Sequence, residues 1–227
     1  MQGFVGTLSG TTISGSGFSI TGTSGTYGGM NYNLVADSSH SGYWSLSVAS
    51  AITNATNILS GSTNLLSAVG SSLNPVLDGG TLKIDAAGPN STAFTLTTNN
   101  GVIDHNGLNA TLAGNITDAT AGSPGRLRIV NGGISGQGTL VLSGTNTYSG
   151  GTEVDAGARL SISSANNIGT GDLVLVGTSS APAVLNVTAT TTIANNITVA
   201  GDPVFNIATG TTATVSSRII IISIKSI

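Results

Sequence analysis

The chain of 227 residues contains no cysteine, and only 7% of its residues are charged. The lack of cysteine excludes a disulfide framework, thiolate metal ligands and a thiol nucleophile. Its six basic residues form no cluster, which argues against nucleic acid as a partner because phosphate binding needs grouped Lys and Arg. No apolar run approaches the length of a membrane helix, and the first residues lack the basic and apolar blocks of a signal peptide. If the parent protein is exported, we expect this chain to be an internal piece of it.

The residues that are abundant are those of short strands and tight turns. Gly, Ser, Thr, Asn, Ala and Val fill most positions, while aromatic residues make up only 4%. Thr and Val suit a pleated strand, and Gly and Asn suit the turns between strands. A hydrophobic content of 39% argues against a disordered chain, since disordered chains are poor in aliphatic residues. The composition therefore predicts an all-β fold.

Pairs of apolar residues separated by one residue recur from about Leu77 onward, which places both members of a pair on one face of a strand. The eight pairs are Leu82/Ile84, Phe94/Leu96, Leu127/Ile129, Leu140/Leu142, Leu160/Ile162, Leu173/Leu175, Leu185/Val187 and Phe205/Ile207. Further strands are expected at 152–154 and 197–199, so that strands recur about every 8 to 13 residues. That spacing fits a sandwich, a barrel or a β-solenoid. The scarcity of aromatic residues disfavours a sandwich core, and stacked coils explain the repeated Thr, Val and Asn.

We therefore predict a right-handed single-stranded parallel β-helix, a solenoid, over 77–216, with about five to seven coils. Residues 1–76 form a Gly/Ser/Thr-rich N-terminal segment in which short strands are expected. Apolar residues at helical spacings within 46–73 predict a short helical insertion or cap there. Residues 217–227 form an atypical tail with four consecutive isoleucines, which fits a buried or edge strand, a truncation or an out-of-register gene end.

The most specific motif is the segment 136–162, GQGTLVLSGTNTYSGGTEVDAGARLSI. We expect its leucines to point inward from one strand and 144–148 to form a corner, and Gly150 and Gly151 permit positive φ. Thr152 and Val154 begin the next strand. The ring of Tyr148 is expected to lie buried under the turn, and Asn146 to bond neighbouring backbone groups.

This segment resembles the autotransporter-associated β-strand repeat of bacterial passenger domains, and a looser similarity extends over 77–208. The pattern positions are Gly138, Leu140, Leu142, Gly144, Asn146, Thr147, Tyr148, Gly150, Thr152, Val154, Gly157 and Leu160. The resemblance implies a structural or adhesive stalk that aids its own secretion, at the cell surface or secreted through the outer membrane of a Gram-negative bacterium. It also implies a translocator barrel elsewhere in the parent protein, and a host-cell, matrix or glycan ligand as partner.

Residues that could carry catalysis are few and scattered, so we expect no enzyme, no cofactor and no metal site. Asp37 and His40 could join a serine in a triad, but no G-x-S-x-G elbow supports one. The aspartates stand at positions typical of turns: Asp78, Asp104, Asp118, Asp155 and Asp202. Two alternatives stay open. A polysaccharide-acting β-helix enzyme would need Asp, Lys and Arg projecting from one face of adjacent coils. A glycan- or receptor-binding module would use an aromatic patch of Tyr27, Tyr32, Tyr43 and Trp44.

Overall fold

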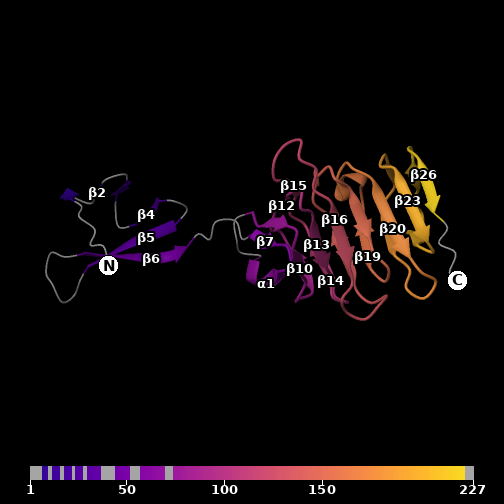
Figure 1. Cartoon of the computed structure of the whole chain (residues 1–227), viewed down its shortest axis with the longest axis horizontal. Coiled ribbons are helices and arrows are strands. Elements are labelled where there is room, and N and C mark those ends of the chain that lie inside the picture. Colours follow the sequence, from indigo (N-terminus) through magenta and orange to yellow (C-terminus); the bar gives the residue numbers. More distant parts are fainter. Residues whose placement is uncertain are drawn as a thin grey trace. The chain divides into compact units, whose positions relative to one another are not determined.

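The computed structural model describes residues 7–9, 12–15, 18–21, 24–27, 30–36, 44–51, 57–69 and 74–222. The chain divides into two compact units, Met1–Asn54 (unit 1) and Ala55–Ile227 (unit 2), each of which is shown in Figure 1. Both units are built of β-strands, but their pairing differs. Unit 1 pairs its strands antiparallel, whereas the sheets of unit 2 are parallel.

Unit 1 contains two small antiparallel sheets. The first sheet consists of β1 (Thr7–Ser9), β2 (Thr12–Gly15) and β3 (Phe18–Thr21), and the second of β4 (Ser24–Tyr27), β5 (Met30–Ala36) and β6 (Trp44–Ala51). Tyr27, Tyr32 and Trp44 belong to these strands. Asp37, His40 and Tyr43 lie outside the described residues.

Unit 2 is a β-solenoid in which the chain passes through three sheets in turn. Sheet 1 has eight strands: β8 (Thr63–Leu65), β10 (Thr81–Lys83), β13 (Gly101–Asp104), β16 (Leu127–Val130), β18 (Thr152–Val154), β20 (Leu173–Gly177), β23 (Ile197–Gly201) and β26 (Ile219–Ile222). Sheet 2 has six: β11 (Gly88–Asn90), β14 (Asn109–Leu112), β17 (Thr139–Leu142), β19 (Arg159–Ile162), β21 (Val184–Val187) and β24 (Val204–Ile207). Sheet 3 comes in two parts, the four strands β7 (Asn57–Leu59), β9 (Val76–Asp78), β12 (Phe94–Leu96) and β15 (Ile116–Asp118), and the pair β22 (Thr191–Ile193) and β25 (Ala213–Val215).

Within each sheet, strands pair with the equivalent strand one coil later, so that about seven turns are stacked in sequence order (Figure 1). The exception is β15, after which sheet 3 is interrupted until β22. In sheet 1, Ile103 pairs with Leu82 on one side and with Ile129 on the other. Like residues therefore form columns, with neighbouring strands about 4.8 Å apart. This arrangement confirms the parallel β-helix predicted from the recurring apolar pairs.

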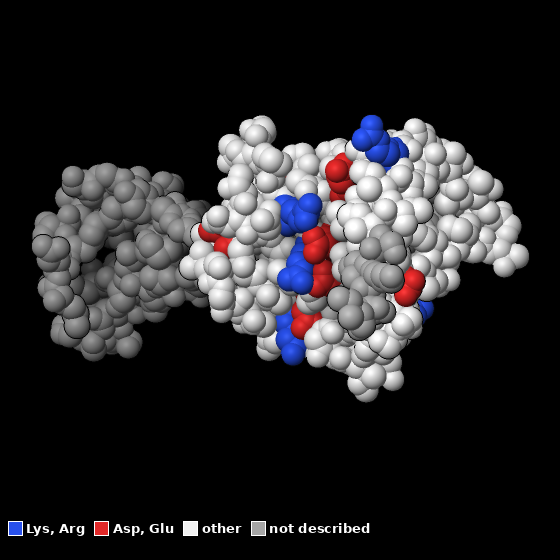
Figure 2. Space-filling model, turned by 45° about the vertical axis from the view of Figure 1, so that its right-hand side comes forward, with Lys and Arg blue, Asp and Glu red and all other residues white. Residues whose placement is uncertain are grey.

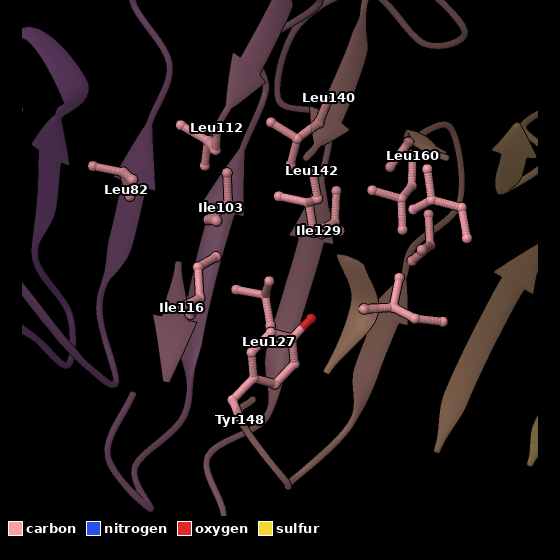
Figure 3. Packing of buried hydrophobic residues seen from close by; sticks show 14 of the residues in the cluster. Leu82, Ile103, Leu112, Ile116, Leu127, Ile129, Leu140, Leu142, Tyr148 and Leu160 are labelled. Atoms are coloured by element: carbon pink, nitrogen blue, oxygen red, sulfur yellow. The ribbon is translucent and has the colours of Figure 1, made fainter. Parts of the chain in front are cut away.

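The core of unit 2 is a continuous aliphatic column between the sheets. Figure 3 shows inward-pointing leucines and isoleucines from successive coils, together with the ring of Tyr148. Seven of the eight predicted apolar pairs are buried. Full burial of one such side chain contributes roughly 1.5–3 kcal/mol, so stability is distributed along the stack.

The eighth pair, Phe205/Ile207, points the same way as Leu185/Val187 in register but is exposed. In the described residues β24 and β26 are the last strands of sheets 2 and 1, and no later strand covers them. The isoleucine run forms β26, an edge strand in parallel register with β23. At the other end, β7 and β8 extend the solenoid to residues before Leu77, where the sequence predicted that the solenoid begins.

The helical prediction over 46–73 holds for a single turn only, α1 (Leu66–Val69), whose Leu66 and Val69 are buried. Strand β6 covers the first part of that range, and β7 and β8 lie further along. The apolar spacing was compatible with a helix, but Ser, Thr and Asn are weak helix formers, and strand pairing with the next coil satisfies the backbone of β7 and β8.

Candidate functional site

The motif segment occupies a place where the solenoid departs from its regular pattern. Between β17 and β18, residues 143–150 run through the position of sheet 3 without forming a strand. One coil later the 3-10 helix η1 (Ala165–Ile168) takes the same position. In place of a regular strand ladder, a few backbone hydrogen bonds and several side-chain hydrogen bonds join these coils.

Asn146 joins three successive coils from within this corner. Its side chain is almost fully buried. Its Oδ1 accepts a hydrogen bond from the Ile116 amide at 2.8 Å, and its Nδ2 donates to the carbonyl oxygen of Asn167 at 2.6 Å. Ile116 lies one coil before and Asn167 one coil after. A side chain with one acceptor and two donors is suited to bridging both directions of a parallel stack.

Tyr148 fills the interior below the same corner. Its side chain is fully buried, and its hydroxyl lies 2.6 Å from Oγ1 of Thr152, at the start of β18. Thr152 in turn donates to the carbonyl oxygen of Ile168 in η1 at 2.8 Å. Burial raises the pKa of Tyr148 well above its usual value, opposed by the hydrogen bond with Thr152, so the phenol stays protonated and serves as a donor.

The paired glycines after Tyr148 act in two different ways. Gly151 has a φ of +92°, as predicted. Gly150, which would also permit positive φ, does not adopt it. A Cβ at Gly150 would lie 2.5 Å from the carbonyl carbon of Gly125, so the close approach of the preceding coil requires glycine there. A Cβ at Gly144 would similarly lie 2.4 Å from the carbonyl oxygen of Gly114.

The remaining motif positions surround this corner. Four of them point into the core and are fully buried: Leu140, Leu142, Val154 and Leu160. Thr147 is exposed. Gly138 and Gly157 have positive φ at the ends of the turns that lead into β17 and β19. The motif residues thus assemble a structural corner, in which the polar groups face other parts of the same chain.

The nature of this corner is decided by comparison with known families. Residues 135–162 match the family model of the passenger-associated-transport-repeat. The chain carries an autotransporter passenger repeat. The match, called the passenger repeat below, spans β17 to β19 and includes Asn146, Tyr148 and Thr152. No curated protein and no solved structure matches the chain. The repeat and the β-solenoid fit a passenger-like structural role at the cell surface.

Charged side chains gather on the outer face of sheet 1, partly within the passenger repeat. Figure 2 shows basic and acidic residues side by side in one band on this face. Arg126 and Glu153 form an ion pair at 2.7 Å, and Arg128 pairs with Asp155 and, at 3.6 Å, with Glu153. The carboxylate of Asp155 raises the pKa of Arg128. Asp, Glu and Arg from adjacent coils therefore project from one face, whereas the polysaccharide-acting alternative called for Asp, Lys and Arg.

Other aspartates accept hydrogen bonds from turns and from neighbouring coils. Asp118 accepts hydrogen bonds from the amide of Gly125 at 2.9 Å and from the hydroxyl of Ser149 at 2.6 Å. Asp104 accepts from the amides of Asn106 and Gly132. Hydrogen bonds from Thr97 and Asn99 lower the pKa of Asp78. These carboxylates are occupied in holding coils together, as turn aspartates commonly are.

Within the described residues, no group of three or more His, Cys, Asp or Glu could hold a metal ion, and no helix is long and apolar enough to cross a membrane. The aromatic patch proposed around Trp44 and the pair Asp37 and His40 depend on side chains outside the described part of the chain. Those two predictions remain untested.

Sequence reasoning missed the contribution of Asn167. This buried side chain donates to the carbonyl oxygen of Gly144 at 3.0 Å and accepts from the amide of Ser164 at 2.9 Å. It thereby closes the corner of the passenger repeat from the following coil. The available signal was Ser163–Ser164 followed by two asparagines, a typical start for a capped turn.

Proposed function

We propose that unit 2 is a stalk segment of an exported surface passenger, and that its coil-by-coil folding favours outward movement of the chain. The observation that supports this most strongly is the passenger repeat itself, whose Asn146 bridges the coils before and after it. Its buried groups serve coil stacking. A stalk is also consistent with carboxylates that bind backbone amides of neighbouring coils.

Stacking explains how such a segment could aid its own secretion. Each coil buries its apolar face against its neighbours, so each newly exported coil adds a favourable increment to the folded stack. The passenger repeat contributes fully buried side chains from three strands and the corner between them. Folding outside the membrane would then disfavour backward movement of the chain.

The test is surface display of the full chain placed between a signal peptide and an outer-membrane translocator in a Gram-negative host. Asn146→Ala and Tyr148→Ala remove the two side chains that hold the corner, and we expect each to lower the displayed fraction several-fold. Thr147→Ala is the matched control, since Thr147 lies in the same corner and is exposed. Display is measured by antibody binding to intact cells and by protease accessibility.

Equal display of all three variants and the unchanged chain would contradict the proposal. Retention of the Asn146 and Tyr148 variants in the periplasm, with normal display of the Thr147 variant, would support it. Variants that reach the surface at normal levels but unfold more easily in vitro would limit the corner to a structural role.

A second candidate function, action on an acidic polysaccharide, is favoured by the charged band of Arg126, Arg128, Glu153 and Asp155. Against it, both carboxylates are already paired with arginines, so a substrate would have to compete with Arg126 and Arg128 for them. The assay is release of reducing ends from polygalacturonate by the full chain, compared with Glu153→Gln. Release that Glu153→Gln abolishes would establish the activity, and no release above a blank would exclude it for this substrate.

A further inference from the structure

His105 occupies an unusual position at the corner between sheets 1 and 2. It follows β13 directly, and its side chain is fully buried. Neither the proposed stalk function nor the charged band uses His105. Histidine is the side chain whose ordinary pKa lies closest to neutral pH, so its charge responds to small changes of environment.

The imidazole bonds to a coil two steps away. Its Nε2 accepts a hydrogen bond from the backbone amide of Arg159 at 3.3 Å, whereas strand pairing joins β14 to β17 and β17 to β19. The corner of the intermediate coil, 131–138, is longer than those of its neighbours, and residues 132–137 are exposed. His105 therefore fills the interior at the point where the intermediate coil bends outward.

This bond fixes the protonation state of the ring. Because Nε2 accepts from the Arg159 amide, the neutral imidazole carries its proton on Nδ1. Nδ1 is buried and has no hydrogen-bond partner within the described residues. A second proton could only go to Nε2, where it would displace the Arg159 amide and place a charge in the interior.

The charged groups on the surrounding elements do not bond to the imidazole. Asp85 binds Ser67, Asp104 accepts from the amides of Asn106 and Gly132, and Asp155 pairs with Arg128. Arg159 is the cation on the neighbouring strand.

Burial lowers the pKa of His105, and the charge of Arg159 lowers it further, while Asp104 and a backbone hydrogen bond act in the opposite direction. The neutral form is favoured in the folded state.

We propose that His105 is an acid-sensitive latch, whose protonation releases the Arg159 amide and opens the solenoid locally at the 131–138 corner and the start of β19. The direction follows from linkage. In the open state His105 takes up a proton below the ordinary histidine pKa of about 6.5. In the closed state its pKa is lower, so it stays neutral until the pH falls further. The latch is therefore closed above about pH 6.5 and weakens as the pH falls below it.

Amide hydrogen exchange of the full chain tests this latch, after correction for the intrinsic pH dependence of exchange. Between pH 7.5 and 5.5 we expect protection of the Arg159 amide to fall about tenfold, since one pH unit below 6.5 changes the proton linkage by a factor of ten. Amides of β20, two strands from this corner, should not change. His105→Gln, which keeps a neutral acceptor, should remove the pH dependence, and His40→Gln, the control at the other histidine, should keep it.

Unchanged protection of Arg159 between the two pH values would overturn the proposal. The same loss in His105→Gln would overturn it as well, by assigning the effect to the nearby carboxylates. If His105→Gln fails to fold, the wild-type imidazole is followed by NMR. Titration at or above pH 6.5 without loss of Arg159 protection would exclude the latch, and titration below 6.5 together with that loss would support it.

Discussion

The hydroxyl of Tyr148 donates to Oγ1 of Thr152 at 2.6 Å, and the hydroxyl of Thr152 donates in turn to the carbonyl oxygen of Ile168 at 2.8 Å. This relay leads from a buried ring to the backbone of the next coil. It resolves the difficulty of placing a phenol inside an aliphatic column, because its polar atom has a partner within the chain. Tyr148 thus both fills the core with its ring and connects two coils through its hydroxyl.

Removal of only the hydroxyl tests the relay. Tyr148→Phe keeps the ring and leaves the buried Thr152 hydroxyl without its donor, so we expect a loss of about 1 kcal/mol in the free energy of unfolding. Tyr148→Ala removes the ring as well and should cost about 3–5 kcal/mol. Urea denaturation followed by circular dichroism gives both values. A Phe variant as unstable as the Ala variant would show that the ring contributes little.

Asn146 offers a second test, because its two hydrogen bonds serve different coils. Asn146→Ala leaves the Ile116 amide and the Asn167 carbonyl unsatisfied, and we expect a cost of about 2–4 kcal/mol. Asn206→Ala is the control: Asn206 also bridges coils, through Asn186, but it is exposed and should change stability by less than about 0.5 kcal/mol. Equal effects of the two substitutions, measured in urea, would contradict the importance of burial.

The charged band on sheet 1 should contribute little to stability. The side chain of Arg128 is 50% exposed, so its ion pairs are screened by water and salt. Arg128→Met should change the free energy of unfolding by less than about 1 kcal/mol at low salt, and the difference should vanish in 1 M NaCl. A larger, salt-independent loss would indicate that the band is a structural element of the stack.

The solenoid could be predicted from sequence because its coils repeat a local rule. Period-two pairs such as Leu140/Leu142 identify buried faces, and the corner motif around Tyr148 is specific enough to identify the repeat. In a solenoid each coil packs against the next coil along the chain, so the order of strands in each sheet follows from the order of the repeats in the sequence.

The features that escaped prediction depend on contacts between coils. The requirement for glycine at Gly150 arises from Gly125 one coil earlier, and the burial of His105 arises from the long corner of the intermediate coil. Likewise, the exposure of Phe205 follows from the absence of a covering strand among the described residues, which its own strand pattern does not reveal.

The stacked-coil account is tested most directly by a spin-label ruler along the outer face of sheet 2. Thr111 in β14 lies in one register column with Asn186 and Asn206. Asn186 is three strands further along the sheet, and Asn206 is four. The chain has no native cysteine, so paired cysteine variants can be labelled without background. At about 4.8 Å per step, electron–electron distance measurement should give about 14 Å for Thr111→Cys with Asn186→Cys, and about 19 Å with Asn206→Cys. An Asn206 distance equal to or shorter than the Asn186 distance would contradict the solenoid.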